Sequence, residues 1–213
     1  MNFHGFLWHR GSLQDLGTLG GDNSEAFWIN DAGEVVGRAD VSGSESHHAF
    51  IWRNGVMTDL GTLGDFPCST AVAINSAEQT VGDTGVCHVG GGPPFLSEHG
   101  QHMVDLSKLV LPGSDITLTD AVTINDRGEI GGMGVLPNGD THAYVLIPCD
   151  DDHADVEGCD YSMVDASFAQ NSNTAPRPAA MTQPSTLSPA QTVNQLRNRW
   201  MQRYRLPGQR PVP

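Results

Sequence analysis

The sequence predicts an all-β fold assembled from repeated units of four short strands. The first observation behind this prediction is that "DLGTLGG" at residues 15–21 returns as "DLGTLGD" at residues 59–65. Self-similarity at a spacing of roughly 40 to 50 residues indicates a repeat architecture. The second is that segments of four to six residues, rich in aromatic and β-branched types, are separated by turn residues.

The chain holds three full copies of the repeat and the start of a fourth. Residues 4–37 align with residues 48–82 with one inserted residue, residues 93–132 form a more divergent third copy, and "HAYVLI" at 142–147 opens a fourth. The recurring positions are His4, His48 and His142; Phe6, Phe50, Phe95 and Tyr144; Asp15, Asp59 and Asp105; Asn30, Asn75 and Asn125; Gly37, Gly82 and Gly132.

Within the second copy the predicted strands are, in order, "HAFIW", "VMTDLG", "TAVAIN" and "QTVGD". The turn between the last two is marked in the other copies by "NDAG" (30–33) and "NDRG" (125–128), which place Gly where a positive φ is needed. The second copy has Glu78 at the corresponding position. We therefore expect its turn to be costlier, or of another type.

The strands "EAFWIN", "TAVAIN" and "DAVTIN" carry apolar residues on both faces, which is typical of strands covered on both sides. This favours sheets stacked face to face in a propeller-like arrangement of about three four-stranded units plus an extra strand. Closed propellers typically have 4 to 8 blades. The surplus strand, "HGFLW" or "HAYVLI", would then either close the ring or leave an open β edge for self-association or for further repeats.

The pattern "HAFIW…G.M.DLGTLG…S.A..IN..G..VG" resembles the HAF repeat, which occurs in bacterial extracellular repeat proteins. The likeness covers about 145 of the 213 residues, and the third copy departs from it at Pro93 and at "DLSKL". The resemblance implies a propeller-like or solenoid β fold and a cell-exterior setting. It implies no activity, because the repeat describes an architecture.

The recurring histidines and aspartates are the first candidates for chemistry, since imidazole and carboxylate together make metal sites or general bases. A residue present once per copy is better explained as architecture. We therefore expect His4, His48 and His142 to bond an Asp or a backbone group of their own copy. His99, His102 and Asp120 belong to one copy only and are the candidate ligand contacts.

The four cysteines form two near pairs. Cys68 and Cys87 both fall in the second copy, and Cys149 and Cys159 flank "DDDHADVEG". Disulfides are the favoured interpretation, with free thiols and a metal site as alternatives, since the spacing is not the C-x-x-C of zinc sites. Disulfides would agree with an exterior location.

Composition and motifs exclude several functions. The net charge of −14 argues against nucleic-acid binding by the body. The glycine-rich stretches lack the Lys of a phosphate-binding loop, and neither a nucleophile elbow nor a zincin motif is present. We assign no catalytic residue, cofactor or metal. From these residues we expect neither a secretory signal nor a membrane-spanning segment.

We predict four segments. Residues 1–148 form the HAF-like β repeat domain, and residues 149–165 form an acidic, Cys-flanked segment, with a solvated turn favoured over a calcium loop. Residues 166–187 read as a disordered linker. Residues 188–206 read as a basic amphipathic helix that docks on the acidic body or a partner, frays, or binds a membrane or nucleic acid.

The leading functional prediction is a non-catalytic extracellular scaffold or binding module with an unknown ligand or protein partner. The alternative is a hydrolase that acts on carbohydrate or another polymer through Asp and His in a propeller channel. A pocket that gathers residues found in one copy only would separate a specific site from repeated architecture.

Overall fold

The computed structural model describes residues 2–43, 45–110, 114–148 and 204–205, and these residues form an all-β fold, as predicted. They make a two-stranded hairpin, three four-stranded antiparallel sheets and one short 3-10 helix. The strands are β1 (Phe6–His9), β2 (Ser12–Asp15), β3 (Gly20–Ile29), β4 (Val35–Val41), β5 (His47–Arg53), β6 (Val56–Gly61), β7 (Cys68–Ile74), β8 (Gln79–Val86), β9 (Gly90–Glu98), β10 (Val104–Asp105), β11 (Thr117–Ile124), β12 (Ile130–Val135), β13 (Thr141–Pro148) and β14 (Tyr204–Arg205), with η1 (Leu106–Lys108) after β10.

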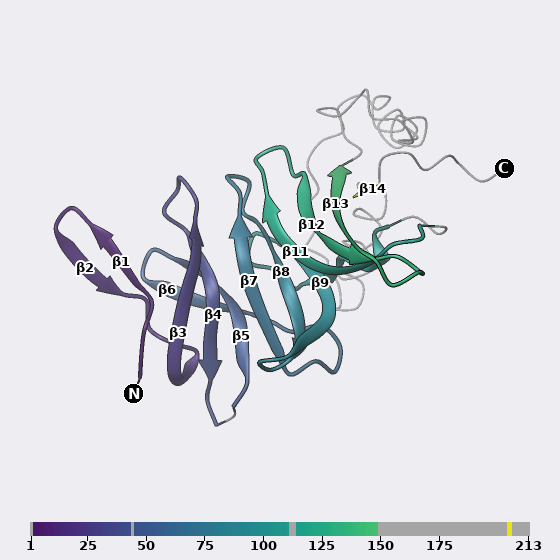
Figure 1. Ribbon diagram of the computed structural model, residues 1–213. Helices are drawn as coiled ribbons and strands as arrows, with labels where there is room; N and C mark the ends of the chain where they lie inside the picture. Colours follow the sequence, from purple (N-terminus) through teal and green to yellow (C-terminus); the bar gives the residue numbers. More distant parts are fainter. Residues whose placement is uncertain (1, 44, 111–113, 149–203, 206–213) are drawn as a thin grey trace, which may run out of the picture.

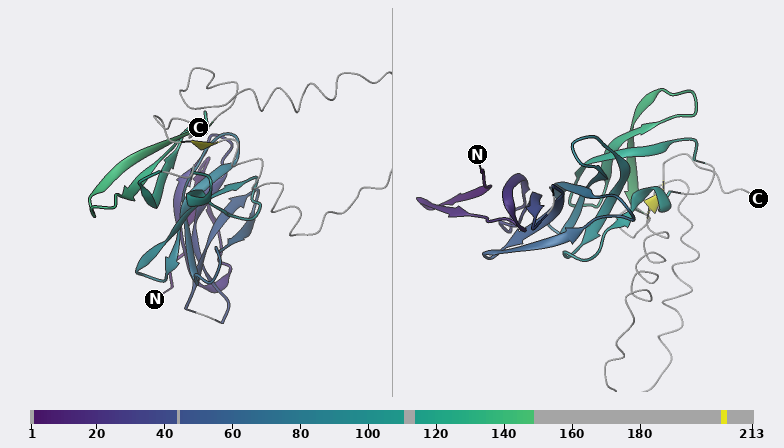
Figure 2. Two further views of the ribbon diagram at one scale, coloured as in Figure 1. Left: turned by 90° about the vertical axis from the view of Figure 1, so that its right-hand side faces the viewer. Right: turned by 90° about the horizontal axis from the view of Figure 1, so that it is seen from below.

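The sheets follow one another in chain order, and in the described part of the chain none closes on itself (Figure 1). Their strand orders are β3-β4-β5-β6, β7-β8-β9-β10 and β11-β12-β13-β14. The β1–β2 hairpin projects at the N-terminal end of the series (Figure 2).

Sheets and sequence copies are out of step by half a repeat. β3 and β4 come from the first copy, whereas β5 and β6 come from the second, and the next sheet joins the second copy to the third in the same way. Neighbouring copies therefore share backbone hydrogen bonds within one sheet. Separating two copies would break strand pairing as well as side-chain contacts.

Each four-stranded sheet carries a bulge at the same position of its first strand. The pairing register shifts between Ala26 and Trp28 in β3, between Ala71 and Ala73 in β7, and between Ala121 and Thr123 in β11. A bulge brings one extra residue against the partner strand and bends the backbone. The recurring glycine of the partner strand accommodates this bend, because a Cβ on Gly82 would overlap the carbonyl oxygen of Thr70.

Three apolar clusters lie between successive layers. Phe50 and Trp52 of β5 face the hairpin side with Leu16, and Ile51 of the same strand belongs to the cluster that it shares with Phe95 of β9. The third cluster joins the second sheet to β11, β12 and β13. Alternate residues of β5 thus enter different cores.

The coverage on both sides that was predicted for "TAVAIN" is confirmed in β7, where Ala71 and Ala73 enter different clusters. For "EAFWIN" the prediction is wrong, because Phe27, Trp28 and Ile29 of β3 are exposed, and in "DAVTIN" Val122 is exposed as well.

The C-terminal sheet presents an uncovered apolar face. Val145 of β13 stands in repeat register with Ile51 and Leu96, which are completely buried, yet Val145 is 50% exposed. Val122 and Met133 on the same sheet are also exposed.

The Asn turns recur as predicted, and they also link the sheets. The side-chain oxygen of Asn75 accepts the backbone N–H groups of Ala77 and Gln79, and its amide donates to the carbonyl oxygen of Asn125 in the next sheet, at 2.9 Å. Asn30 donates to the carbonyl oxygen of Asn75 in the same way, at 3.1 Å. Glu78 has a φ of 58°, so the second copy uses the same left-handed position without glycine.

The prediction of a helix over 188–206 is wrong for Tyr204 and Arg205. Tyr204 and Arg205 form β14, which pairs antiparallel with Pro148 and Ile147 of β13. The free edge of β13 offers unpaired backbone groups, and an extended segment satisfies them. The rest of that segment, together with 149–165 and 166–187, lies outside the described residues. Across the described ranges, no helix has the length and apolarity that a membrane crossing requires.

Candidate functional site

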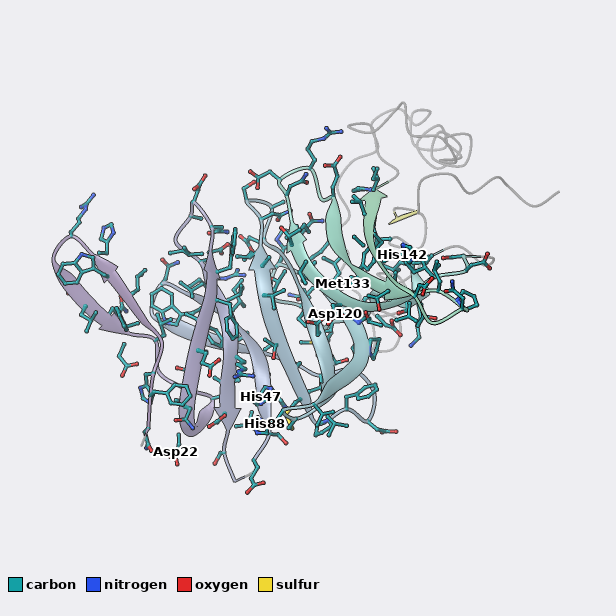
Figure 3. The ribbon with its side chains drawn as sticks, viewed as in Figure 1. Asp22, His47, His88, Asp120, Met133 and His142 are labelled. Carbon is teal, nitrogen blue, oxygen red and sulfur yellow. A yellow bond between two sulfur atoms is a disulfide. The ribbon has the colours of Figure 1, made fainter. Side chains whose placement is uncertain are left out.

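A polar cavity of about 980 Å³ lies where the ends of β3, β4 and β5 meet the β8–β9 turn. We call it the groove. Asp22, His47 and His88 lie along this edge of the molecule (Figure 3). Among the described residues, those that line it are Phe3, Gly20, Gly21, Asp22, Asn23, Ser24, Glu25, Arg38, Asp40, Val41, Gly43, Glu45, His47 and His88.

Arg38 of β4 is the cation of the groove. Its Nε and Nη2 donate to the two carboxylate oxygens of Glu25 on β3, each at 3.0 Å, in a bidentate pair. Its guanidinium also lies 5.8 Å from the centre of the Phe27 ring. A fork-shaped pair of this kind fixes the orientation of both side chains, so Arg38 presents its remaining donors in a defined direction.

Asp40 and Asn23 form a second fixed polar pair in the groove. Asn23 Nδ2 donates to Asp40 Oδ2 at 2.7 Å, and Asn23 Oδ1 accepts the backbone N–H of Phe3 at 3.1 Å. Their positions on β3 and β4 follow from the antiparallel pairing of these strands. Hydrogen bonds within the protein thus fix the positions of the Asn23 and Asp40 side chains in the groove.

His47 opens β5 and is buried at 6% exposure. Its backbone N–H donates to Cys68 Sγ at 3.2 Å, and its ring lies 5.7 Å from that of His88, centre to centre. Burial, reinforced by the charge of Arg38, lowers the pKa of His47 below its usual value. His47 therefore stands as a neutral imidazole at neutral pH.

Cys68 and Cys87 form a disulfide between the start of β7 and the β8–β9 turn, which confirms the pairing predicted from their common copy. Cys149 and Cys159 lie outside the described residues. The bond closes a loop with a sequence separation of 19, and closing a loop of this size stabilises a fold by about 3 kcal/mol. It also fixes the turn that carries His88 beside the groove.

His47, Cys68 and Cys87 are also the described residues whose side-chain chemistry suits a metal ion. Their ligand atoms all lie within 4.8 Å of one another, and His47 Nδ1 is 3.4 Å from Cys68 Sγ. While the sulfurs are bonded to each other they are not thiolates, and the thiolate is the form that ligates metals.

A second cavity of about 290 Å³ adjoins this cluster and shares Arg38, His47 and His88 with the groove. Asp83 of β8 and Asp120 of β11 line it. Burial raises the pKa of Asp83 to about 6; the backbone N–H of Ala121 donates to its carboxylate and opposes the shift, and the charge of Asp120 adds to it.

The raised pKa of Asp83 predicts a pH-dependent cost to the fold. Because the folded protein holds this proton more tightly than the unfolded chain, stability falls as pH rises from about 4 to about 6 and then stays low. We expect Asp83→Asn to increase the free energy of unfolding by roughly 1 to 3 kcal/mol at pH 7.5 and to change it little at pH 4. Urea denaturation at the two pH values measures this difference.

Asp140→Asn supplies the control for that measurement, because Asp140 is exposed in the β12–β13 turn. Its effect on stability should be small and should not follow the same pH window. An Asp83→Asn variant that is destabilised at pH 7.5 would show that the carboxylate is needed in its charged form.

The repeated His and Asp residues form pairs within their own copies. His4 Nδ1 lies 2.8 Å from Asp15 Oδ2, and His48 Nδ1 lies 2.9 Å from Asp59 Oδ2. Both aspartates also accept the backbone N–H two residues on, which holds the loop after β2 and after β6. These pairs recur with one geometry and lie outside both cavities.

The third and fourth copies lack one member of this pair. Pro93 replaces the histidine in the third copy, and Asp105 instead accepts the backbone N–H of Ser107 at the start of η1. His142 is exposed on the last sheet (Figure 3), and the copy that it opens has no counterpart of Asp15.

The three predicted ligand contacts are not brought together. His99 lies 3.3 Å from a carboxylate oxygen of Glu78, and His102 is exposed; neither lines the groove or the second cavity. Asp120 lines the second cavity.

Sequence reasoning missed Arg38, His47 and His88. Arg38 stands where the other copies have Asp83 and Met133. His47 stands where the other copies have Phe3, Gly92 and Thr141. The sequence did carry a signal for Arg38 and His47. Each differs from the residues at the equivalent positions of the other copies, whereas a residue next to it matches the repeat.

A scan of the chain against protein-family models found no match, and searches of curated proteins and of solved structures found none either.

Proposed function

We propose that the chain is a non-catalytic, HAF-like repeat module of the cell exterior that binds a neutral saccharide in the groove. The observation that carries the proposal is that the groove gathers side chains whose types do not recur at the equivalent repeat positions, chiefly Arg38 and His47. Residues that serve the repeat architecture recur in register, whereas these do not. The disulfide is compatible with an oxidising exterior setting.

The proposed architecture is propeller-like. The half-repeat offset supports it, because each sheet borrows strands from the next copy. The β1–β2 hairpin supports it too, since its strands correspond in the repeat register to β5 and β6, the last two strands of the following sheet. The face around Val145 is exposed, whereas the faces in the same repeat register, around Ile51 and Leu96, are buried by stacking of the sheets.

The chemistry of the groove favours a polyhydroxylated, uncharged ligand. Four carboxylates, from Asp22, Glu25, Asp40 and Glu45, and the guanidinium of Arg38 line the groove, and these five groups give a formal charge of −3. This charge disfavours phosphate and other anions. Orienting polar groups and fixed donor and acceptor pairs suit hydroxyl groups, and Phe3 offers an apolar surface at the rim.

The test is an array of neutral and charged glycans probed with the oxidised, full-length chain, followed by calorimetric titration of the best neutral glycan. Arg38→Met places in this copy the residue that the third copy carries, Met133, so the sheet should tolerate it. We expect this variant to lose at least about tenfold in affinity, because it removes charge-assisted hydrogen bonds.

His142→Asn is the matched control, since His142 is exposed on the last sheet, away from the groove. Its affinity should equal that of the unchanged protein. Binding that is confined to charged glycans, or that Arg38→Met leaves intact, would refute the proposal.

A hydrolase acting on carbohydrate is the second candidate, and one observation favours it. Asp83, whose pKa burial raises to about 6, lines the same cavity as Asp120, which accepts a hydrogen bond from Thr119 Oγ1 at 2.8 Å. Two carboxyl groups in different environments are the usual acid and base of glycoside hydrolysis. Turnover of a glycan that Asp83→Asn abolishes would support this candidate over the binding module.

A further inference from the structure

The disulfide and the histidines beside the groove have a second chemistry available. The cluster consists of His47, Cys68 and Cys87, whose ligand atoms lie within 4.8 Å of one another, and of His88, which follows Cys87 directly. His47 and Cys68 are buried at 6% and 3% exposure. Two sulfurs and two imidazoles are a ligand set that zinc favours.

The distances fit a tetrahedral ion once the sulfurs are separate. With bonds of about 2.3 Å to sulfur and about 2.0 Å to nitrogen, neighbouring ligand atoms in a tetrahedral zinc site lie about 3.3 to 3.8 Å apart. His47 Nδ1 already lies 3.4 Å from Cys68 Sγ. The Cα atoms of the two cysteines are 5.1 Å apart, so both side chains reach one point.

The surroundings supply what a metal site needs outside its ligands. The backbone N–H of His47 donates to Cys68 Sγ at 3.2 Å, and a hydrogen bond of this kind stabilises a thiolate and orients it. The second cavity, lined by His47, Cys68 and His88, gives an ion a path from solvent. The charge of Arg38 is matched by its bidentate pair with Glu25.

We propose that reduction of the Cys68–Cys87 disulfide converts this cluster into a Cys₂His₂ site for a zinc-class divalent ion, with His47, Cys68, Cys87 and His88 as ligands. A dithiol reductant supplies two electrons and two protons, is itself oxidised to a disulfide, and leaves two thiols. Binding of the ion then releases both thiol protons to solvent as the two sulfur–metal bonds form. The site is independent of the proposed saccharide, which is bound by the oxidised chain.

His88 is the adjustable ligand. It is exposed, lies in the three-residue turn between β8 and β9, and has a φ of 64°. Its ring centre is already 5.7 Å from that of His47. A small movement of this turn would bring His88 to the fourth position, whereas His47 is held by β5.

The experiment uses the full chain carrying Cys149→Ser and Cys159→Ser, so that Cys68 and Cys87 are its remaining cysteines. The protein is reduced, freed of reductant without oxygen, and titrated with Co²⁺, followed by Zn²⁺ as competitor. We expect one equivalent of Co²⁺ to bind with the intense visible absorption of a tetrahedral thiolate site. We also expect Zn²⁺ to displace it and far-UV circular dichroism to remain that of a β protein.

The histidine variants distinguish a site with four protein ligands from Co²⁺ binding by the two thiols alone. His47→Phe, which places here the residue that Phe3 provides in the first copy, should weaken Co²⁺ binding at least tenfold. His88→Ala should weaken it and alter the visible bands, whereas His142→Asn should change neither. The folding control is the oxidised His47→Phe variant. If it keeps the disulfide and the circular dichroism spectrum of the unchanged protein, the variant folds.

Three results would overturn the proposal. The first is that the reduced chain fails to bind Co²⁺. The second is that the reduced chain and its His47→Phe variant bind Co²⁺ equally well. The third is that the chain unfolds on reduction and Zn²⁺ does not restore its structure. Glycan binding by the oxidised chain is a separate measurement, so failure of the metal site and failure of the saccharide site are distinguishable.

Discussion

Gly82→Ala is expected to lower the free energy of unfolding by about 3 kcal/mol or more. A Cβ at this position would overlap the carbonyl oxygen of Thr70 and lie 2.9 Å from Cα of Ala71. Both atoms belong to the backbone of the bulged strand β7, so a side-chain rotation cannot relieve the overlap. Guanidinium denaturation of the variant and the unchanged protein measures the loss.

Gly131→Ala is the control for this prediction. Gly131 lies in the equivalent strand of the last sheet, and a Cβ there would approach one atom, the methyl group of Thr123, at 2.9 Å. Thr123 is exposed, and its side chain can move. The expected loss is below about 1 kcal/mol. Equal losses in the two variants would mean that the bulge does not demand glycine.

The recurrence of Gly82 was visible in the sequence, whereas its cause was not. Strands, turns and the repeat follow from local patterns, and the disulfide followed from two cysteines appearing together in one copy. The bulge opposite Gly82 depends on the pairing register between β7 and β8. A glycine between apolar residues is equally consistent with a turn, a bulge or close packing.

The half-repeat offset of the sheets escaped prediction for a related reason. Alternation along β5 tells which residues share a face, but it does not tell whether β5 pairs with β4 of the preceding copy or with strands of its own copy. The groove depends on that choice. Arg38 and His47 come from paired strands, and His88 comes from the next sheet. Residues so distant in sequence meet through stacking that no local pattern encodes.

Asn75→Ala is expected to cost about 3 to 5 kcal/mol, because it removes several hydrogen bonds at a buried site. Asn75 is 3% exposed. Its Oδ1 accepts the N–H groups of Ala77 and Gln79, and its Nδ2 donates to Gln79 Oε1 and to the carbonyl oxygen of Asn125. The substitution leaves two donors and two acceptors without their Asn75 partners, both in its own turn and between two sheets.

Asn125→Ala separates these two contributions. Asn125 makes the equivalent bonds to its own turn, through the N–H groups of Arg127 and Glu129, but it is exposed at the last sheet. Its loss should cost about 1 to 2 kcal/mol, as for other local caps. The excess for Asn75 then measures what the link between sheets contributes. Should both variants lose the same free energy by urea denaturation, the asparagine bonds stabilise turns alone, and the stacking of sheets rests on the apolar clusters.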